Sequence, residues 1–596
     1  MADLGDFSDF DPDGEDDVDR GGTTTTSAGS FDEMDVPPVP TDETALGTVA
    51  VSEGLSIGEH HEDTRIRTYV TAGNRSELRL GTYVVAPYPD GEMLFARVSG
   101  LEYGQEFEAD DATEIHARRA MSQSEFEERD YKFIASLAPV AVLSEEDGDL
   151  QRRMVDRVPK PETVVRAASD RREIKTGLDI PETGVFLGHL AVGGQRIRTA
   201  ATPPTIDYRL RDDYERGDPL VFRHTLVAGG TGSGKTHAAK NVLRQYLGRT
   251  YRMGEDRTPK LAIVQFDPQD EYAQMHDDNP SLPEDVADTY ARQDIACGGH
   301  EETLALVPEV EGATYEAVGH RAEWIPFTIP FSMVRQNPWL AAGAGLNDHQ
   351  YQGLHELLDQ FFRDYGATGT YQQFLGFVDD PDRRESLDER GIVHEATYDA
   401  IQRRVRGFGH VFDQDADPIT DLVHELVRPG GLTTVPTYHV GQSRAVETVV
   451  LAVASLLVDQ KLSNDPDFDR IKETPLVIGM DEAHNFLTDA ESAQARRVIG
   501  KFADAAKQGR KERLGLFLIT QDPQDIAEPV FKQINSKVVL NLGDEAAIKA
   551  VNLPTELEGR VPYMEQGGMV VHSPDNSDPV ELAGLEYCVT RHGRDV

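Results

Sequence analysis

Cysteine is almost absent from this chain of 596 residues, since Cys297 and Cys588 are the only two and lie far apart in the sequence. Two isolated cysteines do not make the spaced clusters that bind zinc, and they exclude a disulfide framework. Such sparse use is typical of a reducing compartment. We therefore expect a cytoplasmic protein whose fold depends on neither disulfides nor a cysteine-bound metal.

Long apolar runs are also missing. The longest dense one covers residues 449–458, which is about half of the roughly 20 residues that a membrane span needs. The N-terminus shows no basic region followed by an apolar run, so we expect no signal peptide and no membrane partner. Apolar residues still make up 39% of the chain, enough for globular domains.

Positive charge is scarce, because 59 Lys and Arg face 105 Asp and Glu, for a net charge of −46. A strong negative charge by itself argues against a nucleic-acid partner. The acids are spread along the whole chain, however, which is typical of halophilic proteins whose counter-ions screen self-repulsion. Local basic clusters are therefore more informative about partners than the net charge.

The chain is too long for one compact core. Residues 1–44 are predicted to be a disordered tail, because residues 1–43 carry 14 acids and one basic residue and little apolar surface. Over residues 45–145, short β-branched or aromatic runs alternate with turn residues and predict a small antiparallel β-barrel. Residues 146–183 are polar and arginine-rich and are expected to be a linker.

Residues 184–560 alternate strand and helix patterns, which predicts an α/β domain with a parallel sheet. Within it, residues of about 331–428 are expected to form a helical insertion, since Leu354, Leu357 and Phe361 recur at helical spacing and indicate core positions. Residues 561–596 are expected to form a C-terminal strand or extension.

The strongest motif is GGTGSGKT at residues 229–236, which follows the apolar run 225–228 and precedes a helical pattern. This is the context of a Walker A loop, in which glycines let backbone N–H groups cradle phosphates. Lys235 is expected to reach the β- and γ-phosphates, and Thr236 to bind Mg²⁺. The predicted ATP-binding residues are Gly229, Gly230, Thr231, Gly232, Ser233, Gly234, Lys235 and Thr236.

A second motif, PLVIGMDEAH at residues 475–484, is an apolar strand that ends in two acids, the form of a Walker B. Asp481 is expected to hold Mg²⁺ through water, and Glu482 to act as general base on the attacking water. The letters DEAH also occur in another helicase superfamily. Asp481 lies 481 − 235 = 246 residues after Lys235, farther than we expect there, and we favour a packing or hydrogen-bonding role for His484.

Two further features follow. The apolar run 514–520 ends at Gln521, which fits a polar sensor beside the γ-phosphate. Between these motifs, seven basic residues fall within the 18 positions 496–513, against two acids. Arg510 is predicted to be an arginine finger for a neighbouring subunit, which is worth roughly 10³–10⁵ in hydrolysis rate, with Arg513 and Arg497 as alternatives. Other members of the cluster could neutralise DNA phosphates in a pore, or form a solvated helix face.

These segments, together with FDPQDEY (266–272), DEAHNF (481–486), QGRK (508–511) and LITQDP (518–523), resemble the HerA/FtsK group of ATPases, and HerA in particular. The resemblance covers roughly residues 45–590. It implies a RecA-like P-loop core of the additional-strand (ASCE) type with ATP and Mg²⁺ as cofactors, behind a barrel of the kind that precedes HerA ATPase cores. The turn PQDEY after Asp267 departs from the pattern, where a Gly or His is expected.

The resemblance further implies a homo-hexameric ring with duplex DNA through its centre, acting as a translocase or helicase in DNA-end processing with a NurA-like nuclease. Two alternatives stay open. One is a conjugation or secretion ATPase that works at a membrane complex. The other is a defence-system NTPase with a different effector.

Overall fold

The computed structural model describes residues 45–50, 55–58, 64–105, 131–342, 345–489 and 492–590. The acidic tail expected over residues 1–44 lies outside these described residues, as do residues 591–596.

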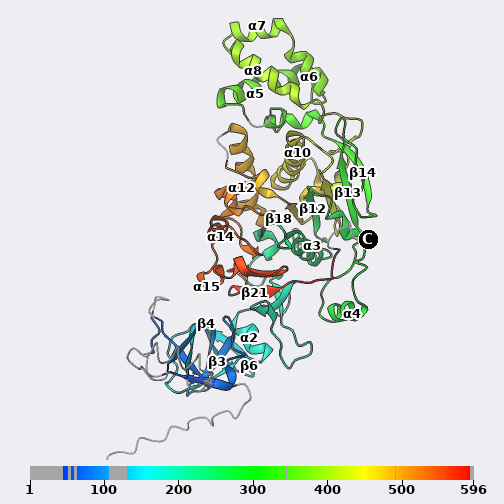
Figure 1. The fold of residues 1–596 in the computed structure, drawn as a ribbon. Coiled ribbons are helices and arrows are strands. Elements are labelled where there is room, and N and C mark those ends of the chain that lie inside the picture. Colours follow the sequence, from blue (N-terminus) through cyan, green and yellow to red (C-terminus); the bar gives the residue numbers. More distant parts are fainter. Residues whose placement is uncertain are drawn as a thin grey trace, which may run out of the picture. The chain divides into compact units, whose positions relative to one another are not determined.

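The N-terminal part of the described chain is a closed antiparallel barrel (Figure 1). Its strands are β1 (Ala45–Val49), β2 (Arg67–Val70), β3 (Tyr83–Pro87), β4 (Met93–Gln105), β5 (Tyr131–Glu146) and β7 (Val164–Ala167). They follow the order β2-β1-β7-β3-β4-β5, and pairing of β2 with β5 closes the ring. Strand β6 (Asp149–Arg153) pairs with β5 outside it. The barrel predicted from short alternating strands is confirmed.

The arginine-rich stretch 146–183, which we expected to be a linker, contains β6, β7 and the helix α2 (Arg171–Gly177). Strand β7 has only four residues, too few for alternation to be recognised, yet it fills the gap between β1 and β3. Helix α2 begins after Asp170, whose carboxylate accepts a hydrogen bond from the Arg172 backbone N–H. This stretch therefore completes the barrel.

The rest of the chain builds one large mixed sheet around a parallel centre. Its order is β10-β8-β21-β20-β19-β11-β18-β17-β12-β16-β13-β14-β15, with β9 paired to β8. The strands are β8 (Val185–Val192), β9 (Gln195–Arg196), β10 (Asp207–Leu210), β11 (Thr225–Ala228), β12 (Ala262–Asp267), β13 (Thr303–Pro308), β14 (Glu323–Thr328), β15 (Asp417–Pro418), β16 (Leu432–Pro436), β17 (Leu476–Met480), β18 (Leu514–Thr520), β19 (Ser536–Val539), β20 (Gly568–His572) and β21 (Val580–Ala583).

The described helices of this part are α3 (Lys235–Tyr246), α4 (Glu284–Arg292), α5 (Asp348–Tyr365), α6 (Tyr371–Val378), α7 (Pro381–Glu389), α8 (Glu395–Val405), α9 (Val423–Leu426), α10 (Ser443–Leu462), α11 (Asp469–Glu473), α12 (Ala493–Glu512), α13 (Glu528–Phe531), α14 (Glu545–Val551) and α15 (Thr555–Glu558). Helices α5 to α8 form the predicted insertion and stand together as one group in Figure 1. Capping boxes at Asn347 and Thr370 begin α5 and α6.

Both faces of the sheet are covered. On β11, Leu226 and Ala228 join a hydrophobic core shared with α10 and α12, whereas Val227 joins the core that contains α3. Alternate residues of a strand point to opposite faces, so helices from both sides shield these central strands. Strands buried on both faces read as continuous apolar runs, which is the pattern of β17 and β18.

The dense apolar run at 449–458 lies in α10, whose middle is buried in this core. Across the described ranges, no helix combines the length and apolarity that crossing a membrane requires.

Candidate functional site: a nucleotide site at the carboxyl edge of the sheet

The order of three strands defines the chemistry available at this edge. Strand β18 lies between β11, which leads into the glycine-rich loop, and β17, which leads into Asp481. All three run parallel, so their carboxyl ends meet at one edge of the sheet. An additional strand between the Walker A and Walker B strands is the arrangement expected of the ASCE type. The site residues predicted from separate motifs therefore share one edge.

The loop 229–234 leaves β11 and turns directly into α3. Gly232 has a φ of +79° and Gly234 a φ of +92°. Residues other than glycine rarely adopt this left-handed backbone conformation. The loop is held by hydrogen bonds from Gly229 N–H to the Thr520 carbonyl (3.2 Å) and from Gly230 N–H to the Asn541 carbonyl (2.7 Å). The start of α3 therefore points at the cavity described below, as an anion-binding helix start requires.

Lys235 and Glu482 face each other across the site. The Lys235 Nζ lies 3.5 Å from Glu482 Oε1, and the lysine is buried whereas the glutamate is partly exposed. Glu482 has φ +52°, unusual for a residue with a side chain. Such a conformation persists only where surrounding structure supports it, and it occurs often at functional sites. The backbone bend at the end of β17 thus brings this carboxylate to the loop lysine.

Asp481 is the more deeply buried of the two acids at the end of β17. Its Oδ2 accepts a hydrogen bond from the Tyr272 hydroxyl (3.0 Å), and its Oδ1 accepts one from the Glu482 N–H (2.9 Å). Burial raises the pKa of Asp481 to about 6, although the nearby Lys235 opposes the shift. A buried carboxylate beside a phosphate-binding loop is well suited to hold a divalent cation, because the ion offsets the charge that burial disfavours.

Gln521 follows β18 and reaches the loop directly. Its Oε1 accepts a hydrogen bond from the Thr231 hydroxyl at 3.1 Å. His484, which we expected to have a hydrogen-bonding role, places Nδ1 3.0 Å from Thr520 Oγ1 and 3.5 Å from Glu482 Oε2. Together these side chains form a polar layer between the glycine-rich loop and the end of β17.

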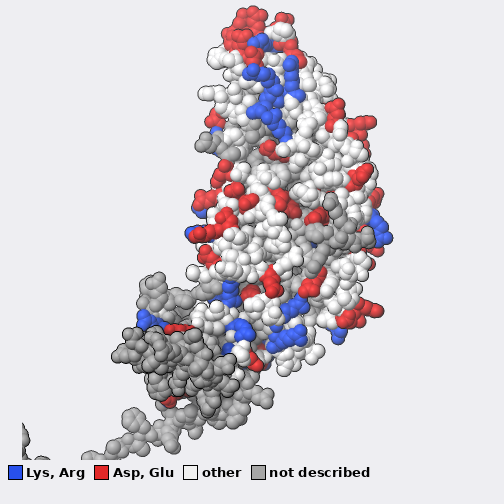
Figure 2. Space-filling view, viewed as in Figure 1, with Lys and Arg blue, Asp and Glu red and all other residues white. Residues whose placement is uncertain are grey.

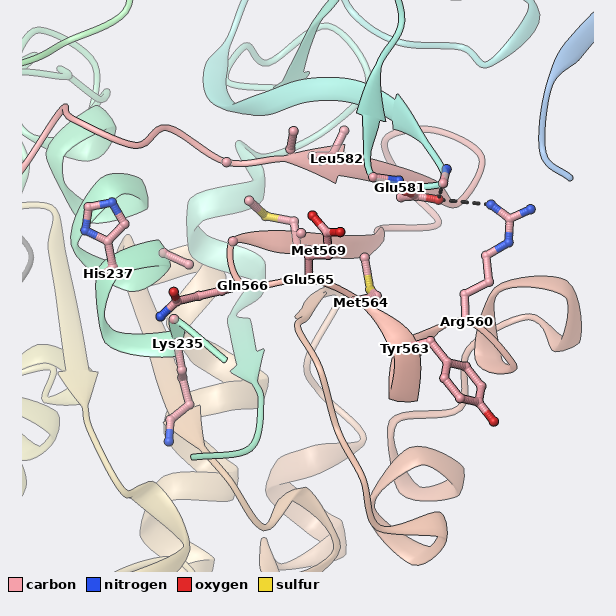
Figure 3. A pocket seen from close by; sticks show the side chains of 18 of the residues that line it. Lys235, His237, Arg560, Tyr563, Met564, Glu565, Gln566, Met569, Glu581 and Leu582 are labelled. Atoms are coloured by element: carbon pink, nitrogen blue, oxygen red, sulfur yellow. Dashed lines mark hydrogen bonds and ion pairs between the residues drawn. The ribbon is translucent and has the colours of Figure 1, made fainter. Parts of the chain in front are cut away.

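A large cavity of about 1160 Å³ opens beside the loop. Residues of the loop and α3, including Thr236, line it together with residues from the C-terminal strands. Figure 3 shows Lys235 and His237 on α3, with the Gln566 side chain next to Lys235 and Met569 on strand β20. At its far end Arg560 Nη1 pairs with Glu581 Oε2 at 2.9 Å. The cavity is large enough for a nucleotide, since ligand pockets commonly measure about 300–1,000 Å³.

The structure does not bring Arg510 to this site. Arg510 lies in the last turn of α12, before β18 begins, whereas Gln521 follows the end of β18. The seven residues of that strand span roughly 23 Å. Arg510 pairs with Asp218 (3.3 Å), and so does Arg513 (2.6 Å). A residue that serves a neighbouring subunit's nucleotide has to lie away from its own, so this position agrees with the trans role without testing it.

Sequence reasoning left several site residues without a role. Asp267, the last residue of β12, accepts backbone hydrogen bonds from Gln269, Glu271 and Tyr272. Burial raises the pKa of Asp267 to about 7. Lys240 on α3 is fully buried, and desolvation lowers its pKa to about 8. In the sequence, the one signal for these residues is the density of acids in FDPQDEY. A partner of this segment, Asp481, lies 209 residues from Tyr272.

These features define a P-loop ATPase core of the RecA-like, additional-strand type, as the motifs predicted. Residues 216–457 match the family described as "Helicase HerA, central domain". The chain is 20% identical over 510 residues to the DNA double-strand break repair helicase HerA of Sulfolobus acidocaldarius, covering 84% of this chain and 87% of that protein. It is 19% identical to the probable helicase MJECL08 of Methanocaldococcus jannaschii, covering 88% of this chain and 92% of that one.

A shorter stretch of 68 residues is 32% identical to HerA of Pyrococcus furiosus and covers 11% of this chain and 12% of that protein. The resemblance to the HerA group predicted from the motifs is thus confirmed. Solved structures similar to this one include VirB4 of Thermoanaerobacter pseudethanolicus (TM-score 0.42, 14% identity, 68% of this chain and 96% of that one). The plasmid coupling protein TrwB with an ATP analogue is a second (TM-score 0.43, 13% identity, 69% and 95%).

Proposed function

We propose that this chain hydrolyses ATP with Mg²⁺ and uses the energy to move along double-stranded DNA, as a HerA-type translocase or helicase. One observation carries the proposal: the side chains of Lys235, Glu482 and Gln521 meet beside one glycine-rich loop, with Asp481 buried next to Glu482. A phosphate cradle, a metal-holding carboxylate, a general base and a polar sensor are the parts that phosphoryl transfer to water needs.

Each predicted residue has a task in this account. Residues 229–236 bind the phosphates, and Thr236 and Asp481 hold Mg²⁺. Lys235 lies 3.5 Å from Glu482 and would contact the γ-phosphate. Glu482 would polarise the attacking water, and Gln521 would orient it.

The DNA substrate and the assembly rest on similarity to proteins named as DNA double-strand break repair helicases. We propose a cytoplasmic homo-hexameric ring around a duplex, with the nucleotides at subunit interfaces and Arg510 acting in trans. A NurA-like nuclease is the proposed partner in processing DNA ends.

The test measures ATP hydrolysis at several KCl concentrations, with and without a blunt duplex, for the wild type and for Lys235→Ala. We expect duplex to stimulate the wild type and the variant to be inactive in both conditions. If duplex does not change the hydrolysis rate at any KCl concentration, the chain is an ATPase but not a DNA translocase, and it works with another effector. Native mass spectrometry with a non-hydrolysable ATP analogue and duplex tests the ring, with six copies and one duplex as the expected mass.

A further inference from the structure

The basic cluster at 496–513 is split by the helix that carries most of it. Helix α12 has 20 residues, and at about 1.5 Å per residue roughly 20 Å along it separates Arg496 and Arg497 from Arg510. In the middle, Lys501 is used internally, with Nζ 2.5 Å from Asp459 Oδ1. At the far end Arg510 and Arg513 share Asp218. The sequence cluster is thus not a single basic surface.

Near the start of α12, two of its arginines contact the start of α5. Arg496 Nη2 lies 2.6 Å from Asp348 Oδ1, and the Arg497 guanidinium stacks 5.1 Å from the centre of the Tyr351 ring. Asp348 and Tyr351 belong to the first turn of α5.

Arg404 near the end of α8 reaches the same place. A Cβ atom at Gly345, three residues before α5, would lie 1.9 Å from Arg404 Nη2. Arg444 in the first turn of α10 lies beside the end of α8, because its Nη1 is 3.9 Å from where a Cβ of Gly407 would be. Four arginines from three helices therefore lie around the start of α5 and the end of α8. We call Arg404, Arg444, Arg496 and Arg497 the arginine patch.

The patch is under-neutralised in a chain that has acids in excess. Arg404, Arg444 and Arg497 make no ion pair within 4 Å among the residues that the structure describes. Among the described residues, the neighbouring acids include Asp348, which pairs with Arg496, and Glu447. Burial raises the pKa of Glu447, and the charge of Arg444 opposes that shift. Figure 2 shows Lys and Arg side chains gathered over the lower part of the helical insertion, below a tip that acids cover. The chain has 105 acids, yet the guanidinium groups of Arg404, Arg444 and Arg497 have no ion-pair partner among the described residues. This arrangement indicates that an external anion binds there.

We propose that the arginine patch binds the phosphate backbone of duplex DNA, an inference that rests on the proposed function. Arginines fixed on several helices suit a backbone contact, because phosphate contacts position a protein on DNA without reading its sequence. In the sequence, α12 begins 493 − 482 = 11 residues after Glu482, so a short segment connects the patch to the end of β17. DNA bound at the arginine patch would therefore contact the helix that follows the segment after Glu482, the proposed general base.

The experiment compares Arg404→Gln/Arg444→Gln with Arg363→Gln/Arg390→Gln. Both doubles remove two positive charges from the helical insertion and its neighbours. Arg363 lies at the far end of α5, roughly 22 Å along the helix from Asp348, and both control arginines are exposed. Arg497 is left intact because it is a candidate finger. Affinity for a fluorescent 30-base-pair duplex is measured from about 0.2 to 2 M KCl, with light scattering on the same samples.

For the patch variant we expect the slope of log K against log[KCl] to become shallower by about 1.8 per engaged subunit, since each lost phosphate contact contributes about 0.9. The control double should keep the wild-type slope, and DNA-independent hydrolysis should be unchanged in both. An unchanged slope in the patch variant overturns the proposal, as does an equal change in the control. A patch variant that loses ring mass but keeps its slope per ring also overturns it, because the arginines then bind a second copy of the chain. A wild type that binds no duplex refutes the proposed function instead.

Discussion

Replacing Asp481 by asparagine should stabilise the nucleotide-free protein while removing its activity. Asp481 is 7% exposed, and burial raises its pKa from 3.8 to about 6. This rise in pKa means that ionised Asp481 destabilises the folded state by about 3 kcal/mol. Asparagine has one acceptor oxygen and keeps only one of the two hydrogen bonds that Asp481 accepts, which costs about 1 kcal/mol. The expected net gain is about 2 kcal/mol.

The gain must depend on pH in a defined direction. The folded state holds the Asp481 proton more tightly than the unfolded state, so between pH 3.8 and about 6 the folded state binds more protons. Stability from this group therefore falls as pH rises through that window, and the full penalty is present above about 6. The advantage of the variant should be complete at pH 8 and absent near pH 4.

Differential scanning calorimetry on both proteins, without nucleotide and at matched salt, measures this. For a unit of roughly 400 residues the entropy of unfolding is about 0.8 kcal/mol/K, so the unfolding temperature should rise by about 2–3 °C at pH 8. Mg²⁺-ATP should stabilise the wild type and leave the variant unchanged. A variant that melts at or below the wild-type temperature at pH 8, or whose gain persists at pH 4, refutes the reasoning.

Four other substitutions probe the proposed reaction. Lys235→Ala should abolish tight ATP binding, as measured by equilibrium dialysis. Glu482→Gln should still bind ATP and stabilise the ring, but its hydrolysis rate should fall by at least about 10²-fold. Normal turnover by Glu482→Gln would contradict the assignment of Glu482 as general base. Tyr272→Phe removes the hydroxyl that stabilises ionised Asp481, so the acid limb of the pH–rate profile should move to higher pH, and an unmoved limb would contradict that role. Arg510→Ala should be inactive alone but regain hydrolysis in mixed rings with Lys235→Ala, because some interfaces then pair an intact loop with an intact arginine; no rescue would leave Arg497 and Arg513 as candidates.

The sequence predicted the parts of the site that come from contiguous motifs. A run of apolar residues that ends in a charged or polar one marks the carboxyl end of a buried strand, and in a parallel sheet such ends meet at one edge. Asp481 and Gln521 were therefore placed beside the loop without knowledge of the strand order. The order itself, with β18 between β11 and β17, came from the resemblance.

What could not be predicted depends on contacts between distant residues. Tyr272 lies 209 residues from Asp481, and no local pattern pairs a tyrosine with a carboxylate. Strand β7 was missed because four residues between polar stretches carry no periodicity, and it forms by pairing with β1 and β3. In the sequence the basic cluster is one continuous stretch, whereas the partners that separate its two ends, Asp348 for Arg496 and Asp218 for Arg510, lie far away in the sequence.

Displacement of a triplex-forming strand from a long duplex tests most directly whether ATP bound at residues 229–236 drives movement along DNA. The wild type should release the third strand with Mg²⁺-ATP, with a delay that grows with the distance between the entry end and the triplex. Glu482→Gln should bind the same duplex and release none. Release by Glu482→Gln at the wild-type rate, or a delay that does not change with distance, would contradict a motor driven from this site.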